Sequence, residues 1–127
     1  MREISKLFKV LSDESRLRAL NLIQERECCV CEVMEVMNIS QSKASRICSA
    51  LYNAGILKLR REGRWAYYSM ATDGIPQYVN TILSGIKVFL NENRISVNER
   101  ERLNNTKRAE IACTNTECKH LTVPAEG

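Results

Sequence analysis

Residues 39–70 read ISQSKASRICSALYNAGILKLRREGRWAYYSM, and the hydrophobic pattern changes its period within this stretch. In the first half, apolar residues recur at helical spacing, with Ser40 as the N-cap and Gly55 just beyond the end. The predicted buried face of this helix consists of Ala44, Ile47, Cys48 and Leu51. In the second half, residues 56–60 and 65–70 favour strands and flank a turn that contains a glycine. This second half therefore predicts a β-hairpin.

Helical periodicity continues on both sides of this stretch. It predicts helices over residues 2–11, from Ser12 to about Arg26, over 31–37 and over about 75–90. A capping-box pattern at 96–99 predicts a last polar helix that continues to about Ile111. The helix over 31–37, the turn at Asn38-Ile39, the Ser40-capped helix and the hairpin together make a winged helix-turn-helix. The predicted fold class is mainly α with a small β-hairpin.

Two parts of the chain differ in character. We expect residues 1–95 to form a DNA-binding and dimerisation domain, and residues 96–127 to form the polar helix and a flexible tail. The apolar stripe on the helix over 75–90 is wide for a surface helix. One side of that helix can pack against its own domain and the other against a second subunit.

Composition limits the classes of function. The chain has 127 residues, of which 44% are hydrophobic and one is His, so it can bury a core but has little material for acid–base catalysis. It also lacks a Gly-rich phosphate loop and a βαβ pattern, and we expect no enzyme. No apolar run is long enough for a membrane span or a signal peptide, so we expect a cytoplasmic protein without a membrane partner.

Basic charge is concentrated in the stretch that was quoted first. Residues 41–64 carry six Lys or Arg against Glu62 alone, while the whole chain has a net charge of +4. The start of a helix fits the major groove, where we expect Gln41, Ser42, Lys43, Ser45 and Arg46 to read base edges. On the hairpin we expect phosphate or minor-groove contacts from Arg60, Arg61 and Arg64. The alternative is a solvated basic face, and Trp65, Tyr67 and Tyr68 are better explained as hairpin packing than as base stacking.

The six cysteines lie at positions 28, 29, 31, 48, 113 and 118. Three within four residues indicate soft-metal binding or redox chemistry, and buried core cysteines are the alternative. On a regular helix Cys29 and Cys31 point about 200° apart, so a site of Cys28, Cys29 and Cys31 requires a non-helical start of the helix. Cys48 is predicted to pack as a small hydrophobe. Cys113 and Cys118 are either exposed thiols in the tail or additional ligands.

Three segments together resemble the ArsR/SmtB family of metal-responsive bacterial repressors: SDESRLRALNLI at 12–23, ISQSKASRICSALYNAGIL at 39–57 and LRREGRWAYYSM at 59–70. The resemblance implies a homodimer that pairs through its first and last core helices. It also implies a repressor that leaves double-stranded operator DNA when an effector binds.

The segment ECCVCE at 27–32 is similar to the thiolate site of the arsenic-, cadmium- and lead-sensing members of that family. Cys29, Val30, Cys31 and Glu32 match their signature, Cys28 replaces an apolar residue, and Met34 lies where some arsenic sensors have another cysteine. The family's Asp/His site for zinc, nickel or cobalt is excluded, because residues 75–95 contain neither Asp nor His.

We therefore predict a repressor that is released by As(III), or by Sb(III), because these ions favour three thiolates. Binding would distort the helix that braces the groove-reading helix. Two alternatives keep the fold and change the signal that releases the repressor from DNA. The first is Cd(II) or Pb(II), with Cys113 or Cys118 as a fourth thiolate. The second is thiol oxidation. A small thiol enzyme is disfavoured by the missing catalytic residues.

Overall fold

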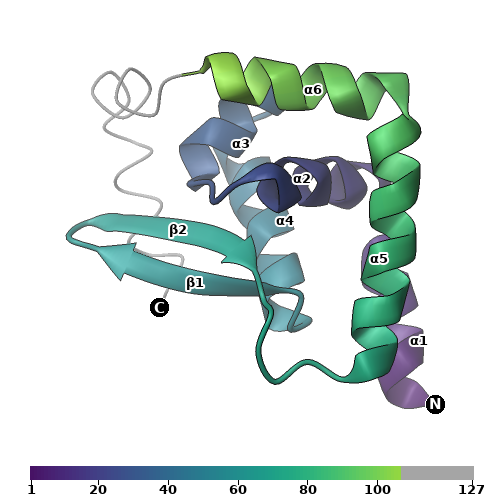
Figure 1. The fold of residues 1–127 in the computed structure, drawn as a ribbon. Helices are drawn as coiled ribbons and strands as arrows, with labels where there is room; N and C mark the ends of the chain where they lie inside the picture. Colours follow the sequence, from purple (N-terminus) through teal and green to yellow (C-terminus); the bar gives the residue numbers. More distant parts are fainter. Residues whose placement is uncertain (107–127) are drawn as a thin grey trace.

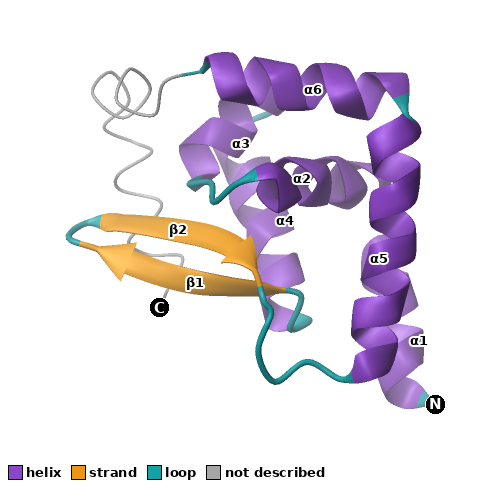
Figure 2. Ribbon diagram, viewed as in Figure 1, coloured by secondary structure: helices purple, strands orange, loops and turns teal. Residues whose placement is uncertain are grey.

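The computed structural model describes residues 1–106, which fold into helices and one two-stranded antiparallel sheet (Figure 1, Figure 2). The elements are α1 (Arg2–Leu11), α2 (Glu14–Glu25), α3 (Val30–Met37), α4 (Gln41–Asn53), β1 (Leu57–Glu62), β2 (Trp65–Met70), α5 (Gln77–Glu92) and α6 (Arg94–Asn105). The prediction of a mainly helical chain with a small hairpin is confirmed. Cys113 and Cys118 lie outside the described residues, as does the predicted continuation of the last helix to Ile111.

Two helix starts differ from their predictions. Asp13 caps α2 and accepts a hydrogen bond from the backbone N–H of Arg16 at 3.2 Å, so the prediction that Ser12 starts this helix is wrong. An ionised carboxylate accepts this bond and also interacts favourably with the positive end of the helix dipole. The start of α3 is Val30 rather than Cys31, because Cys29 takes the N-cap position.

The start of α6 also differs from the capping box that residues 96–99 predict. Asn93 is the cap, with its side-chain oxygen accepting a hydrogen bond from the Ser96 N–H at 3.0 Å. Glu99 turns toward α2 instead and accepts a hydrogen bond from Arg18 Nε at 3.0 Å. Leu103 is completely buried, so α6 packs onto the rest of the chain. The boundary at residue 95 between the two predicted parts stays a prediction.

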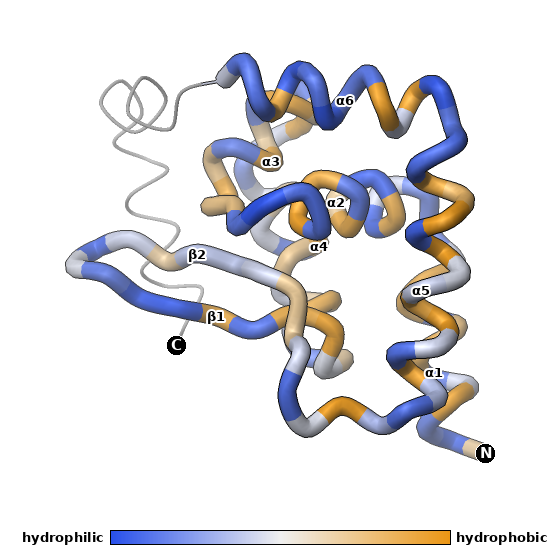
Figure 3. Tube along the Cα trace, viewed as in Figure 1, coloured by the Kyte–Doolittle hydropathy of each residue, from blue (hydrophilic) through white to orange (hydrophobic). Residues whose placement is uncertain are grey.

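The core forms where α2, α3 and α4 pack together and the hairpin closes over them. Its largest fully buried side chains include Leu22, Leu51 and Tyr68. The predicted face of α4 is confirmed, since Ala44, Ile47, Cys48 and Leu51 are all buried. Figure 3 shows the contrast with the outer surface, where most of α6 and the outer part of the hairpin are hydrophilic.

The hairpin pairs β1 with β2 from Leu57 opposite Met70 to Glu62 opposite Trp65. Gly63 lies in the turn with a φ of 61°, a left-handed conformation that glycine adopts without steric cost. The paired strands carry the basic tip away from the helices (Figure 1).

The stripe on α5 divides into two sides. Val79, Leu83 and Leu90 are buried within the chain. Val88 and Phe89 are 58% and 62% exposed, and Phe8 of α1 is 52% exposed. These exposed side chains leave an apolar surface on α1 and α5. Across residues 1–106, no helix is both long enough and apolar enough to cross a membrane.

Candidate functional site

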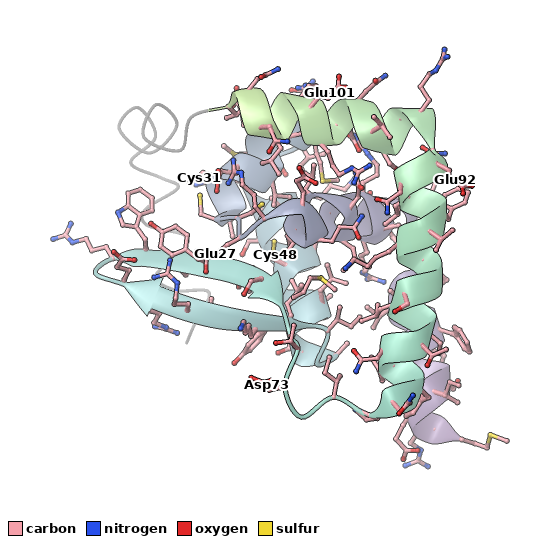
Figure 4. All side chains as sticks on the ribbon, in the orientation of Figure 1. Glu27, Cys31, Cys48, Asp73, Glu92 and Glu101 are labelled. Carbon is pink, nitrogen blue, oxygen red and sulfur yellow. The ribbon has the colours of Figure 1, made fainter. Side chains whose placement is uncertain are left out.

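The cysteine segment, residues 27–31, links α2 to α3 and lies along β2. Cys28 is extended and pairs with Tyr68 through two backbone hydrogen bonds, from Cys28 N to Tyr68 O at 2.9 Å and from Tyr68 N to Cys28 O at 2.7 Å. A single β-bridge therefore attaches the cysteine segment to β2 of the two-stranded sheet. Figure 4 shows Glu27 beside the hairpin and Cys31 at the start of α3.

The three neighbouring cysteine side chains face two different environments. The Cys28 side chain belongs to the main core, where its Sγ lies 3.2 Å from the carbonyl oxygen of Arg26. Cys29 and Cys31 are equally buried but belong to a second cluster with Tyr67, against which Trp65 packs. The structure thus brings Cys29 and Cys31 together and separates Cys28 from them. Within residues 1–106, no three Cys, His, Asp or Glu side chains are grouped as a metal site would require.

The non-helical start that a site of these cysteines requires is present. Cys28 is in a β-bridge and Cys29 is extended at the N-cap, so only Cys31 is within the helix. The extended conformation of Cys29 removes the opposed orientation that a regular helix would impose on Cys29 and Cys31. Both side chains can consequently face the cluster with Tyr67.

Burial also changes the acidity of two cysteines, Cys28 and Cys48. It raises the pKa of Cys28 far above its ordinary value, and the nearby Glu32 carboxylate adds to this shift. A thiol must lose its proton before it binds a soft metal, so burial disfavours Cys28 as a ligand in this conformation. Burial likewise raises the pKa of Cys48 to about 12. Cys48 is completely buried in the main core, which supports the prediction that it packs as a small hydrophobe.

A buried ion pair fixes the start of α3. Glu32 Oε1 accepts a hydrogen bond from the Cys29 backbone N–H at 2.9 Å, and Glu32 Oε2 lies 2.7 Å from Arg26 Nη1. Arg26 Nη2 also donates to the Leu103 carbonyl oxygen at 3.1 Å. Arg26 therefore ties the cysteine segment and α3 to the last turn of α6. The sequence analysis did not predict its role, because the contact with Leu103 joins residues 77 positions apart and the pair with Glu32 depends on how the segment before α3 folds.

The residues predicted to read bases lie on the first two turns of α4. Ser42, Lys43 and Arg46 are exposed, and Gln41 and Ser45 are half-buried. Ser40 caps the helix as predicted and accepts a hydrogen bond from the Lys43 N–H at 3.1 Å. The first two turns of α4 thus present polar and basic groups at the surface, while the opposite face lies in the core.

Sequence reasoning missed Arg16, which lies beside these residues. A hollow of about 220 Å³ is lined by Asp13, Ser15, Arg16, Lys43, Arg46 and Ile47. Its three basic side chains come from α2 and α4, which makes it suited to a phosphate group. The charge count along the chain missed Arg16 because this residue is far from the basic stretch in sequence.

The hairpin arginines are Arg60, Arg61 and Arg64, and all three are exposed. Arg60 differs from a simple exposed side chain, because it makes ion pairs with Glu27 at 2.7 Å and with Glu62 at 2.5 Å. Its guanidinium also lies over the ring of Tyr67, 4.7 Å from the ring centre. Tyr67 and Tyr68 are buried, as expected for residues that pack the hairpin.

The arrangement of α3, α4 and the basic-tipped hairpin defines a winged helix-turn-helix protein. Residues 13–58 match the family described as bacterial regulatory protein, arsR family. Over 81 residues the chain is 43% identical to the arsenic resistance transcriptional regulator ArsR1 of Pseudomonas putida, which covers 63% of this chain and 62% of that protein. Over 95 residues it is 36% identical to the cadmium resistance transcriptional regulatory protein CadC homolog of Staphylococcus aureus, which covers 74% of each.

A solved structure agrees with this assignment. The homodimeric winged helix-turn-helix DNA-binding domain of a possible ArsR-family regulator from Mycobacterium bovis is 25% identical and superposes with a TM-score of 0.60 over 73% of this chain and 82% of that one. The chain belongs to the arsR family of bacterial regulatory proteins. The predicted family, the winged fold and the assignment as a DNA-binding transcriptional regulator rather than an enzyme are confirmed. The match spans less than two thirds of the length of ArsR1.

Proposed function

We propose that this chain represses transcription from operator DNA and is released when As(III), or Sb(III), binds to its cysteine thiolates. The observation that carries the proposal is the shared cluster of Cys29 and Cys31 beside β2, at the non-helical start of α3. Thiolates are the ligands that soft ions select, and As(III) favours three of them. Several relatives of this chain are named for arsenic or arsenical resistance, which supports the choice of ion.

Cys29 and Cys31 supply two sulfurs that already lie together. The third sulfur is Cys28 after rearrangement, or Cys113 or Cys118, which lie outside the described residues. Cys28 becomes a ligand only if its side chain leaves the main core and loses its proton. Either route changes the packing of the cysteine segment against β2 and α3.

α3 is the element that joins ligand binding to DNA binding. It packs against α4, whose first turns we propose to enter the major groove, and Glu32 ties its start to Cys29. Displacement of this start moves the support of Gln41, Ser42, Lys43, Ser45 and Arg46. Ligand binding and DNA binding then disfavour each other, with a coupling free energy of about 1–3 kcal/mol.

We also propose that the DNA-binding unit is a homodimer that pairs through α1 and α5. The exposed Phe8, Val88 and Phe89 supply an apolar surface on these helices. Each copy in such a dimer would carry one α4 helix, so each could read one half-site of the operator. The Mycobacterium bovis domain, which shares this fold, is described as homodimeric.

A titration of the reduced protein on DNA tests this function. A labelled duplex selected from a random pool for tight binding is followed by fluorescence anisotropy while arsenite, Cd(II), Zn(II) or peroxide is added. We expect release by arsenite. Cys29→Ser and Cys31→Ser should retain DNA binding and lose release, whereas the control Cys48→Ala should be released like the parent protein. Full release of either serine variant would show that the site is wrong.

Cd(II) is the second candidate effector, because one relative is named as a cadmium resistance regulator. Release by Cd(II) but not by arsenite would favour it, and release by peroxide alone would favour a thiol-redox input. The DNA interface is tested separately. Arg64→Ala should weaken binding to all sequences and reduce its salt dependence, while Ser42→Ala should change sequence preference.

A further inference from the structure

An ion pair joins the cysteine segment to the hairpin. Glu27, directly before Cys28, pairs with Arg60 of β1 through both carboxylate oxygens: Arg60 Nη2 lies 2.7 Å from Oε1, and Arg60 Nε lies 3.0 Å from Oε2. Two parallel hydrogen bonds fix the plane of a guanidinium as well as its position. The orientation of Arg60 therefore depends on the position of Glu27.

A second contact links Arg60 to the cluster of Cys29 and Cys31. The guanidinium lies over the ring of Tyr67, and Tyr67 packs in the buried cluster of Cys29 and Cys31. Arg60 consequently touches both the carboxylate that precedes the cysteines and the ring that covers two of them. The hydrogen bonds between Cys28 and Tyr68 hold these parts in register. Residues 27–31 are thus connected to Arg60 by two contacts, through Glu27 and through Tyr67.

We propose that Glu27 is a positioning residue for DNA release, which orients Arg60 and transmits changes at the cysteines to the hairpin. This inference rests on the proposed function. In the structure, Glu27 and Glu62 both pair with the Arg60 guanidinium, which lies over the Tyr67 ring. From this position we propose that Arg60 meets a phosphate of the DNA. When the cysteine segment rearranges around a ligand, Glu27 moves with it and Arg60 loses that position.

The decisive quantity is the ratio of the DNA dissociation constants with and without arsenite, measured at constant ionic strength. Glu27→Gln removes the ion pair to the cysteine segment. Glu62→Gln is the matched control, because Glu62 pairs with the same Arg60 and carries the same charge but belongs to β1 itself. An exposed ion pair is worth about two- to five-fold in an equilibrium constant. We expect Glu27→Gln to reduce the ratio by about this factor and Glu62→Gln to leave it unchanged.

Two further measurements test whether Glu27 positions Arg60 or instead takes part in arsenite binding. Arsenite affinity without DNA, read from the emission of Trp65, should be unchanged in Glu27→Gln. Arg60→Gln should lower the ratio as Glu27→Gln does, and the double variant should lower it no further, because the two residues act through one contact.

The outcomes are distinguishable. A ratio in Glu27→Gln that equals that of Glu62→Gln overturns the role of Glu27 while leaving the proposed function intact. A loss of arsenite affinity in Glu27→Gln overturns it as well, because Glu27 would then act at the thiolate site itself. If the parent protein is not released by arsenite, both the proposed function and this inference fail.

Discussion

Replacing Glu32 by glutamine removes the charge from a carboxylate that is completely buried at the start of α3. The amide oxygen of glutamine can still accept the hydrogen bond from the Cys29 N–H. The ion pair with Arg26, at 2.7 Å in the structure, is lost. The substitution thus tests the charge of Glu32 with little change of shape.

The expected loss of stability depends on how far Glu32 and Arg26 are each buried. Breaking a buried ion pair by removing one partner costs about 3–5 kcal/mol. Arg26 is 32% exposed and keeps its bonds to two carbonyl oxygens, so solvent and these bonds reduce the cost of its lost partner. We therefore expect a loss near the lower limit, about 3 kcal/mol in the free energy of unfolding, which raises the unfolded fraction about a hundred-fold.

Urea unfolding measures this loss. The protein concentration is held fixed, because the transition of the proposed dimer would depend on it. Glu35→Gln is the control, since Glu35 lies on the same helix and is exposed. It should change stability by less than about 0.5 kcal/mol. If Glu32→Gln costs no more than this control, the ion pair does not stabilise α3, and its role in holding the cysteine segment is refuted.

Three other predictions concern single side chains. Trp65, the only tryptophan of the chain, packs against the cluster of Cys29 and Cys31, so its emission should change when arsenite is added and should not change in Cys29→Ser. Leu103→Ala should cost about 3 kcal/mol in a single urea transition because Leu103 is completely buried, and Ile95→Ala, at 65% exposure, should cost almost nothing. Cys48→Ala should lower stability by about 1–2 kcal/mol without changing release by arsenite, since its thiol lies in the main core. The first expectation is wrong if the Trp65 emission does not change with arsenite. The second is wrong if α6 unfolds in a separate, earlier transition. The third is wrong if Cys48→Ala changes release by arsenite.

Local sequence patterns predicted much of the fold. The period of Ala44, Ile47, Cys48 and Leu51 gave the buried face of α4, and the glycine between two strand-forming runs gave the hairpin. These features depend on residues within one helix or one turn, so the order of residues is sufficient to predict them. Helix starts were less certain, because Ser12 and Asp13 are adjacent and both residue types can act as caps.

The candidate site was predictable only in part. The cluster of cysteines is visible in sequence, but the separation of Cys28 from Cys29 depends on pairing with Tyr68 in β2. The contacts of Glu27 with Arg60 and of Arg18 with Glu99 join residues that are 33 and 81 positions apart. Such contacts depend on how the elements pack, and neither periodicity nor capping rules describe that packing.

The residues that we propose to read bases, at positions 41–46, share no position with the cysteine segment at 27–31. Each set belongs to its own piece of backbone, and the part of α3 after Cys31 lies between them. The DNA sequence that is bound and the ligand that is sensed can therefore be changed independently, during evolution or in the engineering of a biosensor. If the proposed roles hold, substitutions on the outer face of α4 would change the DNA sequence that is bound, and a replaced cysteine segment would change the ion that causes release.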